Sequence, residues 1–183
     1  MAEKITGLPE SGITLLVVSA KRYLATNIEV VKLFVNQRDF YCIYVTLNRP
    51  FASLKNILEA EKIKMERMFF IDCITRMVGG TQRAGNVIFT QAPQNLTELS
   101  ISITKIIESM PKEAKKFLFL DSLSTLLIYN ASGTVTQFVH FLTSKVRLWG
   151  IGAVFVSLEK EADEKLLSTL SSFADNIVSI DSE

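Results

Sequence analysis

The sequence predicts an α/β fold with a mostly parallel central sheet that helices cover on both faces. Short runs of continuously apolar residues recur along the chain, and stretches with helical spacing of apolar residues separate them. Strands that are apolar on both sides are typical of parallel sheets, because crossover helices bury both faces. The chain has 183 residues, of which 48% are hydrophobic and 21% charged. This length and composition predict one compact domain over residues 1–183.

Strands and helices alternate through the first half of the chain. The runs predicted as strands cover residues 14–19, 41–47, 68–72 and 86–90. The helix predicted between the first two runs has its apolar side at Ile28, Val31, Phe34 and Val35. Pro50 is typical of a helix start, and the helix that follows has Leu54, Ile57 and Leu58 on its apolar face. Residues 75–85 hold three glycines and two arginines without periodicity, which indicates an exposed, mobile loop.

The second half has clearer helix boundaries. Asn95 and Glu98 have the spacing of a capping box, and the helix that they begin ends before Pro111. Its apolar positions are Leu96, Leu99, Ile103, Ile106 and Met110. The apolar positions of the next helix are Val135, Phe138, Val139, Leu142 and Val146. Gly150 is expected at the C-terminal cap of this helix. Strands are predicted at 117–120, 151–157 and 177–180, and a further helix at 162–170.

Composition and charge narrow the function classes. The net charge is +1 and the Lys and Arg residues are scattered, so composition indicates neither a nucleic-acid surface nor an anionic-membrane surface. No segment reaches the roughly 20 uninterrupted apolar residues of a membrane span, and residues 1–12 lack the apolar core of a signal peptide. Cys42 and Cys73 lie in apolar runs, which favours buried thiols in a reducing compartment over a disulfide.

Residues 14–27 are built like the strand and turn of a phosphate-binding loop but lack the residues that bind phosphate. The apolar run ends in Ser19, and a helical pattern resumes after Thr26. A phosphate-binding loop needs glycines so that successive N–H groups turn inward, a Lys for the terminal phosphates, and a Ser or Thr hydroxyl for Mg²⁺. The segment from Ala20 to Asn27 contains no glycine.

Five segments carry a family resemblance through their order and spacing. They are GLPESGITLLVVS (7–19), YCIYVTLNRPFASLKNIL (41–58), FLFLDSLSTLL (117–127), GIGAVFVSLEKE (150–161) and FADNIVSID (173–181). Together they resemble the RecA-like superfamily, and most of all the archaeal KaiC-like and RadA-like ATPase domains. The third segment resembles the Walker B strand of that superfamily. The resemblance implies a RecA-like three-layer α/β/α domain over almost the whole chain, and it says less about activity than about fold.

Family roles carried onto this chain show how the phosphate loop departs from the family pattern. Thr26 and Asn27 stand where the family has its phosphate-binding Lys and its Mg²⁺-binding Thr. Alanines replace the loop glycines, and Tyr23 and Leu24 fill the middle of the loop with bulk. Such side chains resist the backbone conformations of a phosphate cradle and occupy its space. The degenerate loop consists of Ala20, Lys21, Arg22, Tyr23, Leu24, Ala25, Thr26 and Asn27.

The family's acidic residues are also mostly absent. The pair that supplies the water-activating Glu corresponds to Asn48 and Arg49, and an Asn cannot accept the proton from water. Asp121, at the Walker B position, is the one expected acid that remains. Two interpretations of Asp121 are open: it caps the helix that begins near Ser122, or it orients a Mg²⁺-bound water. We favour the cap.

These departures favour a non-catalytic RecA-like domain that has lost nucleotide binding and acts as an interaction or regulatory subunit. We expect no catalytic residue, no bound metal and no cofactor. In the superfamily, neighbouring subunits meet around the nucleotide, so a degenerate member retains a contacting surface after the chemistry is lost. The expected partner is a second copy in a homo-oligomer, an active RecA-like relative or another protein. Because the resemblance is to archaeal proteins, a cytoplasmic location is expected.

Two alternatives stay open. In the first, the chain is a weak ATPase that holds ATP and magnesium through Lys21, Arg22 and Asp121, whereas solvated surface charges are the simpler interpretation of the two cations. In the second, the chain is a DNA-associated recombinase paralogue, which the near-zero net charge disfavours. The loop residues that would contact DNA are Arg76, Gly79, Gly80 and Arg83.

Overall fold

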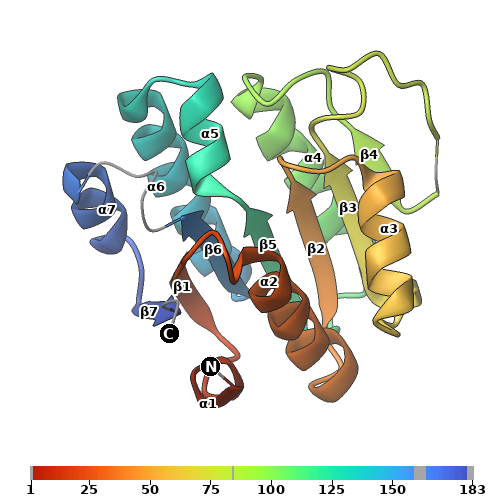
Figure 1. Ribbon diagram of the computed structural model, residues 1–183, viewed down its shortest axis with the longest axis horizontal. Coiled ribbons are helices and arrows are strands. Elements are labelled where there is room, and N and C mark those ends of the chain that lie inside the picture. Colours follow the sequence, from red (N-terminus) through yellow and green to blue (C-terminus); the bar gives the residue numbers. More distant parts are fainter. Residues whose placement is uncertain (1, 84, 159–163, 181–183) are drawn as a thin grey trace.

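Seven parallel strands form one sheet in the computed structural model, which describes residues 2–83, 85–158 and 164–180 (Figure 1). They are β1 (Gly12–Val18), β2 (Tyr41–Thr46), β3 (Met68–Asp72), β4 (Val87–Phe89), β5 (Lys116–Asp121), β6 (Gly152–Leu158) and β7 (Asn176–Ile180). Their order across the sheet is β4-β3-β2-β5-β6-β1-β7, and each neighbouring pair is parallel. The predicted α/β class with a mostly parallel sheet is confirmed.

Helices cover the sheet on both faces, which gives the three layers visible in Figure 1. They are α1 (Ala2–Thr6), α2 (Tyr23–Val31), the π-helix η1 (Lys32–Gln37), α3 (Phe51–Ala60), the 3₁₀ turn η2 (Met65–Arg67), α4 (Leu96–Ser109), α5 (Leu123–Tyr129), α6 (Ser132–Trp149) and α7 (Glu164–Ser171). Successive residues of β2 point to opposite layers: Ile43 packs in the core under α4, α5 and α6, whereas Tyr44 packs in the core under α2, η1 and α3.

Local sequence signals account for the start of α3, the start of α4 and the end of α6. The Asn95 side chain accepts a hydrogen bond from the Glu98 N–H at 3.0 Å, so α4 begins at the predicted cap. Gly150 has a φ of 64° and ends α6 in the left-handed conformation that glycine adopts most readily. Pro50 immediately precedes α3, as predicted.

Other expectations are met in part. Cys42 and Cys73 are buried and free, as predicted. Residues 159–163 and 181–183 lie outside the described residues, and so do the polar end of segment 150–161 and the start of the helix predicted at 162–170. None of the described helices is long and apolar enough to cross a membrane.

Candidate functional site

The turn between β1 and α2 is shorter than a phosphate-binding loop. Helix α2 begins at Tyr23, whereas the sequence pattern predicted a helix only after Thr26. Residues 19–22 alone connect the strand to the helix, compared with the roughly eight residues of the phosphate-loop pattern. The Arg22 N–H donates to the Ser19 carbonyl at 3.0 Å, which closes a tight turn. Most of the segment predicted as a degenerate loop is therefore the first turns of α2.

The side chains in the predicted Lys and Thr positions face the protein interior. Thr26 and Asn27 are buried on the side of α2 that packs against the sheet. Neither polar atom of the Asn27 side chain makes a hydrogen bond of normal geometry with a described residue, and the same holds for the Ser19 hydroxyl. Lys21 is exposed on the turn, and Arg22 is half-buried.

Asp121 lies at the carboxyl end of β5 and is buried beneath the same edge of the sheet. The Tyr44 hydroxyl donates to its Oδ2 at 2.6 Å, and the Asn48 amide donates to its Oδ1 over a longer 3.4 Å. Burial raises the pKa of the Asp121 carboxyl to about 8. The carboxyl therefore holds its proton over most of the range up to neutral pH and carries little negative charge there.

The expectation that Asp121 caps α5 is wrong. Ser122 is the capping residue, since its hydroxyl accepts a hydrogen bond from the Thr125 N–H at 3.3 Å. The Asp121 side chain instead turns toward Tyr44 and Asn48. Ser122 directly precedes the helix, and its short side chain reaches forward to the N–H of the residue three positions later. The peptide bond between Asp121 and Ser122 is cis.

Asn48 connects the start of α2 to the junction between β5 and α5. Its amide donates to the Tyr23 hydroxyl, and its carbonyl oxygen accepts from the Thr125 hydroxyl. The same amide approaches Asp121 at 3.4 Å and the Ser122 hydroxyl at 3.5 Å. Side chains from α2, the segment after β2, and the β5–α5 junction thus form one hydrogen-bonded cluster, which we call the edge cluster. The sequence pattern identified each of its regions, but it did not predict that Tyr23 contacts Asn48.

A second buried acid, Asp72 at the end of β3, was not assigned a role from sequence. Its Oδ2 accepts from the Phe51 N–H at 2.6 Å and from the Thr75 hydroxyl at 2.5 Å. Its Oδ1 accepts from the N–H groups of Ile74 and Thr75, both at 2.8 Å. Asp72 therefore fixes the first turn of α3 and the turn after β3. The signal available in the sequence was an acid that directly follows a buried apolar run.

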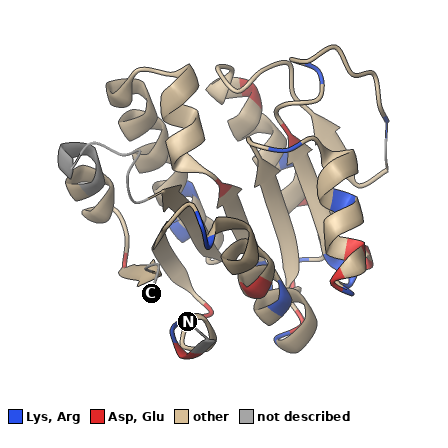
Figure 2. Ribbon diagram, viewed as in Figure 1, with Lys and Arg blue, Asp and Glu red and all other residues tan. Residues whose placement is uncertain are grey.

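The glycine-rich loop after β3 brings its two arginines to one cavity. Arg76 and Arg83, the arginines named in the DNA alternative, line this cavity of about 430 Å³ together with Gly79 and Gly80. The Gly80 N–H donates to the Thr75 carbonyl at 2.8 Å, and a side chain at this glycine would clash with Thr75. Figure 2 shows Lys and Arg interspersed with Asp and Glu over several elements of the molecule. Among the residues described, no three His, Cys, Asp or Glu side chains are grouped as metal ligands.

Comparisons with known proteins agree with this fold. The structure is similar to that of a KaiC-like protein, PH0186, from the hyperthermophilic archaeon Pyrococcus horikoshii OT3, with a TM-score of 0.69 and 12% sequence identity. The match covers 94% of this chain and 72% of the other. At this identity the likeness shows a KaiC-like, RecA-like fold. A search of curated proteins found no significant match. Residues 12–180 match a family of unknown function, DUF7504, and the chain therefore belongs to that family.

Proposed function

We propose that this chain is a RecA-like domain that does not bind nucleotide and acts as an interaction or regulatory subunit. The observation that carries the proposal is the edge cluster, in which Tyr23 from the start of α2 hydrogen-bonds to Asn48 above Asp121. In an active relative, phosphates and Mg²⁺ would lie between the corresponding loop and acid. In this chain, the start of α2 and Asp121 are instead connected by side chains that are hydrogen-bonded to one another.

The chemistry of the individual groups supports the same proposal. Mg²⁺ prefers ionised carboxylates and phosphate oxygens, whereas Asp121 has a pKa of about 8 and already accepts from Tyr44 and Asn48. A phosphate cradle needs several N–H groups directed at one anion, but the Arg22 and Thr26 N–H groups donate to the carbonyls of Ser19 and Arg22. These residues do not fit a Mg-nucleotide, so we derive no step through one.

The interaction role is supported by the apolar surface of the molecule. Ile101 of α4 is 50% exposed and Phe141 of α6 is 47% exposed, and both line one groove between these helices. Monomeric proteins tolerate single exposed apolar residues, but apolar residues that meet on neighbouring helices are typical of a surface that another protein covers. The resemblance to the RecA-like superfamily also supports an interaction role, because the subunits of that superfamily contact one another.

Thermal unfolding with and without Mg-ATP or Mg-ADP tests the proposal. A ligand at 100 times its Kd adds about 2.7 kcal/mol to the free energy of unfolding, which for a chain of this length raises Tm by roughly 5–10 °C. We expect no such shift. The matched variant is Tyr23→Ala, which removes the side chain that connects α2 to Asn48 and should not create nucleotide binding by itself.

A rise in Tm with Mg-ATP that disappears in Asp121→Asn would contradict the proposal, because the nucleotide would then bind at the edge cluster. A rise that persists in Asp121→Asn would also contradict the loss of nucleotide binding, and it would place the binding site elsewhere on the chain.

A further inference from the structure

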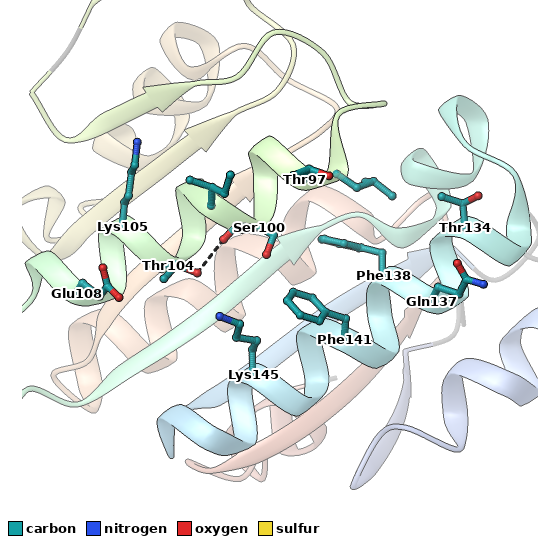
Figure 3. Close-up of a pocket in the computed structure, with 12 residues that line it drawn as sticks. Thr97, Ser100, Thr104, Lys105, Glu108, Thr134, Gln137, Phe138, Phe141 and Lys145 are labelled. Atoms are coloured by element: carbon teal, nitrogen blue, oxygen red, sulfur yellow. Dashed lines mark hydrogen bonds between the residues drawn. The ribbon is translucent and has the colours of Figure 1, made fainter.

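An open groove separates α4 from α6 on the face of the sheet opposite α2 and α3. Its volume is about 780 Å³. Figure 3 shows Phe138, Phe141 and Lys145 pointing from α6 toward α4. Two of the α4 side chains that line it, Ser100 and Thr104, are small and leave room between the helices. The Thr104 hydroxyl donates to the Ser100 carbonyl at 2.9 Å, so it is directed back onto its own helix.

The groove has an apolar middle and a C-terminal end at which cations outnumber carboxylates. Both helices lead into parallel strands, α4 into β5 and α6 into β6, so their N-terminal ends lie at the same edge of the sheet. Ile101, which is 50% exposed, and Phe141, which is 47% exposed, line the middle of the groove, one on each wall. One helical turn farther on, Lys105 and Lys145 line the C-terminal end together with Glu108, so two cations and one carboxylate lie there. The polar side chains of Thr97, Ser100, Thr134 and Gln137 line the N-terminal end.

The two lysines have no carboxylate partner among the residues that the structure describes. The ion pairs formed by those residues involve other cations. Lys145 contacts aromatic rings instead, with its Nζ 5.7 Å from the centre of the Phe141 ring and 5.5 Å from that of Trp149. Two such cations beside an apolar surface favour a partner that supplies both apolar side chains and carboxylates.

We propose that this groove binds an amphipathic helix of a partner protein, with apolar side chains in the middle of its contacting face and carboxylates at one end. A helix is favoured over an extended segment because the walls are helices, whose backbone groups are already paired and cannot add a strand. The lined length of α4, from Leu96 to Glu108, is about 18 Å or about three helical turns. The proposal deepens the interaction role proposed above, and it rests on that role for the expectation of a protein partner.

A second copy of this chain fits the groove less well. A two-fold axis across the groove would set Lys105 and Lys145 of one copy against the N-terminal end of the other, where the described lining contains no carboxylate. A two-fold axis along the groove would set the lysines of the two copies against each other, so in both cases cations would be covered without enough counter-charges. A helix with carboxylates at one end avoids this cost.

A designed peptide tests the proposal directly. The probe is a blocked, fluorescein-labelled helix of about 14 residues, with Leu and Phe at i, i+3, i+4 and i+7 and two Glu residues in its last turn. The comparison peptide has Lys in place of both Glu residues. Fluorescence anisotropy with wild-type protein should give about 10-fold tighter binding of the acidic peptide, equivalent to about 1.4 kcal/mol.

Variants of the groove should change binding in a defined pattern. Phe141→Ser should weaken the acidic peptide by about 10-fold or more, because an aromatic contact is lost. Leu148→Ser is the matched control, since Leu148 lies on the same helix, is more exposed and does not line the groove. It should leave binding unchanged. The double variant Lys105→Glu with Lys145→Glu should reverse the preference, so that the basic peptide binds more tightly.

Several results would overturn the proposal. They are failure of both peptides to bind, equal binding of both, an equal loss in Leu148→Ser and Phe141→Ser, or an unchanged preference in the double variant. If Phe141→Ser does not fold by circular dichroism, the double variant, whose changes are at charged positions, still decides. Dimerisation of the wild type that Phe141→Ser abolishes would assign the groove to a second copy instead.

These outcomes are separable from the proposed loss of nucleotide binding. A Tm shift with Mg-ATP together with selective peptide binding would refute the loss of nucleotide binding and leave the groove assignment intact. Absence of both would refute only the groove assignment.

Discussion

The edge cluster and the groove between α4 and α6 are opposite in construction. In the edge cluster, Tyr23, Asn48 and Asp121 are hydrogen-bonded within the protein. In the groove, the apolar side chains of Ile101 and Phe141 are about half exposed, and no other described part of the protein covers the rest of their surface. A polar site whose groups are already paired gains little from a ligand, whereas exposed apolar surface gains free energy when a partner covers it. The comparison teaches that the polar groups of the edge cluster are paired within the protein, whereas the groove leaves apolar surface uncovered.

The largest effect that we expect in the edge cluster is a dependence of the free energy of unfolding on pH, caused by Asp121. An unfolded Asp ionises at about pH 4, whereas the folded Asp121 has a pKa of about 8. Between these values the folded state binds one more proton than the unfolded state, so the free energy of unfolding falls as the pH rises and is constant above about pH 8. The fall is on the order of 5 kcal/mol.

Urea unfolding between pH 5 and pH 9, followed by the fluorescence of Trp149, measures this slope. Asp121→Asn should flatten it, because an amide does not ionise in this range. Asp39→Asn, at an exposed position, is the control and should leave the slope as in the wild type. A wild-type slope that Asp121→Asn does not change would mean that the edge cluster holds an ionised carboxylate.

The second effect concerns Asp72, the other buried acid at a strand end. Asp72→Ala leaves three N–H groups and the Thr75 hydroxyl without their acceptor, so we expect a loss of about 3 kcal/mol or more in the free energy of unfolding. Thr75→Val removes one of the four donors and should cost about 1 kcal/mol. Urea denaturation measures both. Equal, small losses would show that Asp72 does not organise this part of the edge.

The smallest effect concerns the link between α2 and Asn48. Tyr23→Phe deletes the hydroxyl that accepts from Asn48, at a half-buried position, so we expect a loss of about 0.5–1 kcal/mol. The control is Tyr129→Phe in α5, a half-buried tyrosine whose hydroxyl makes no hydrogen bond with the described residues. It should be neutral. If the two changes cost the same, the Tyr23 hydroxyl contributes nothing to closing the edge cluster.

Sequence patterns predicted the fold well because burial imposes them. Continuous apolar runs were required in strands covered on both faces, and the capping signal of Asn95 acts within a few residues. The predicted start of α2 was wrong. The helix propensity of residues 23–25 and the contact between Tyr23 and Asn48 extend the helix into the segment expected to be a loop. The role of Asp121 was also wrong, since Ser122 caps α5 and the packing of β2 beside β5 brings Tyr44 to the carboxyl group.

The groove was not predicted because it depends on two helices meeting in space. Ile101 and Phe141 lie off the apolar stripes that predicted the core faces of α4 and α6. A large apolar residue off the stripe of an amphipathic helix was the available signal. Nothing in the spacing along one helix indicates that the other helix places a second such residue beside it.

Isothermal titration of the wild-type protein with Mg-ATP tests the central claim most directly, because it measures whether the edge cluster excludes nucleotide. The account predicts no saturable heat up to millimolar ligand. A saturable heat with a Kd below about 100 μM that Asp121→Asn abolishes would contradict it, since the nucleotide would then displace the hydrogen bonds that join Tyr23, Asn48 and Asp121.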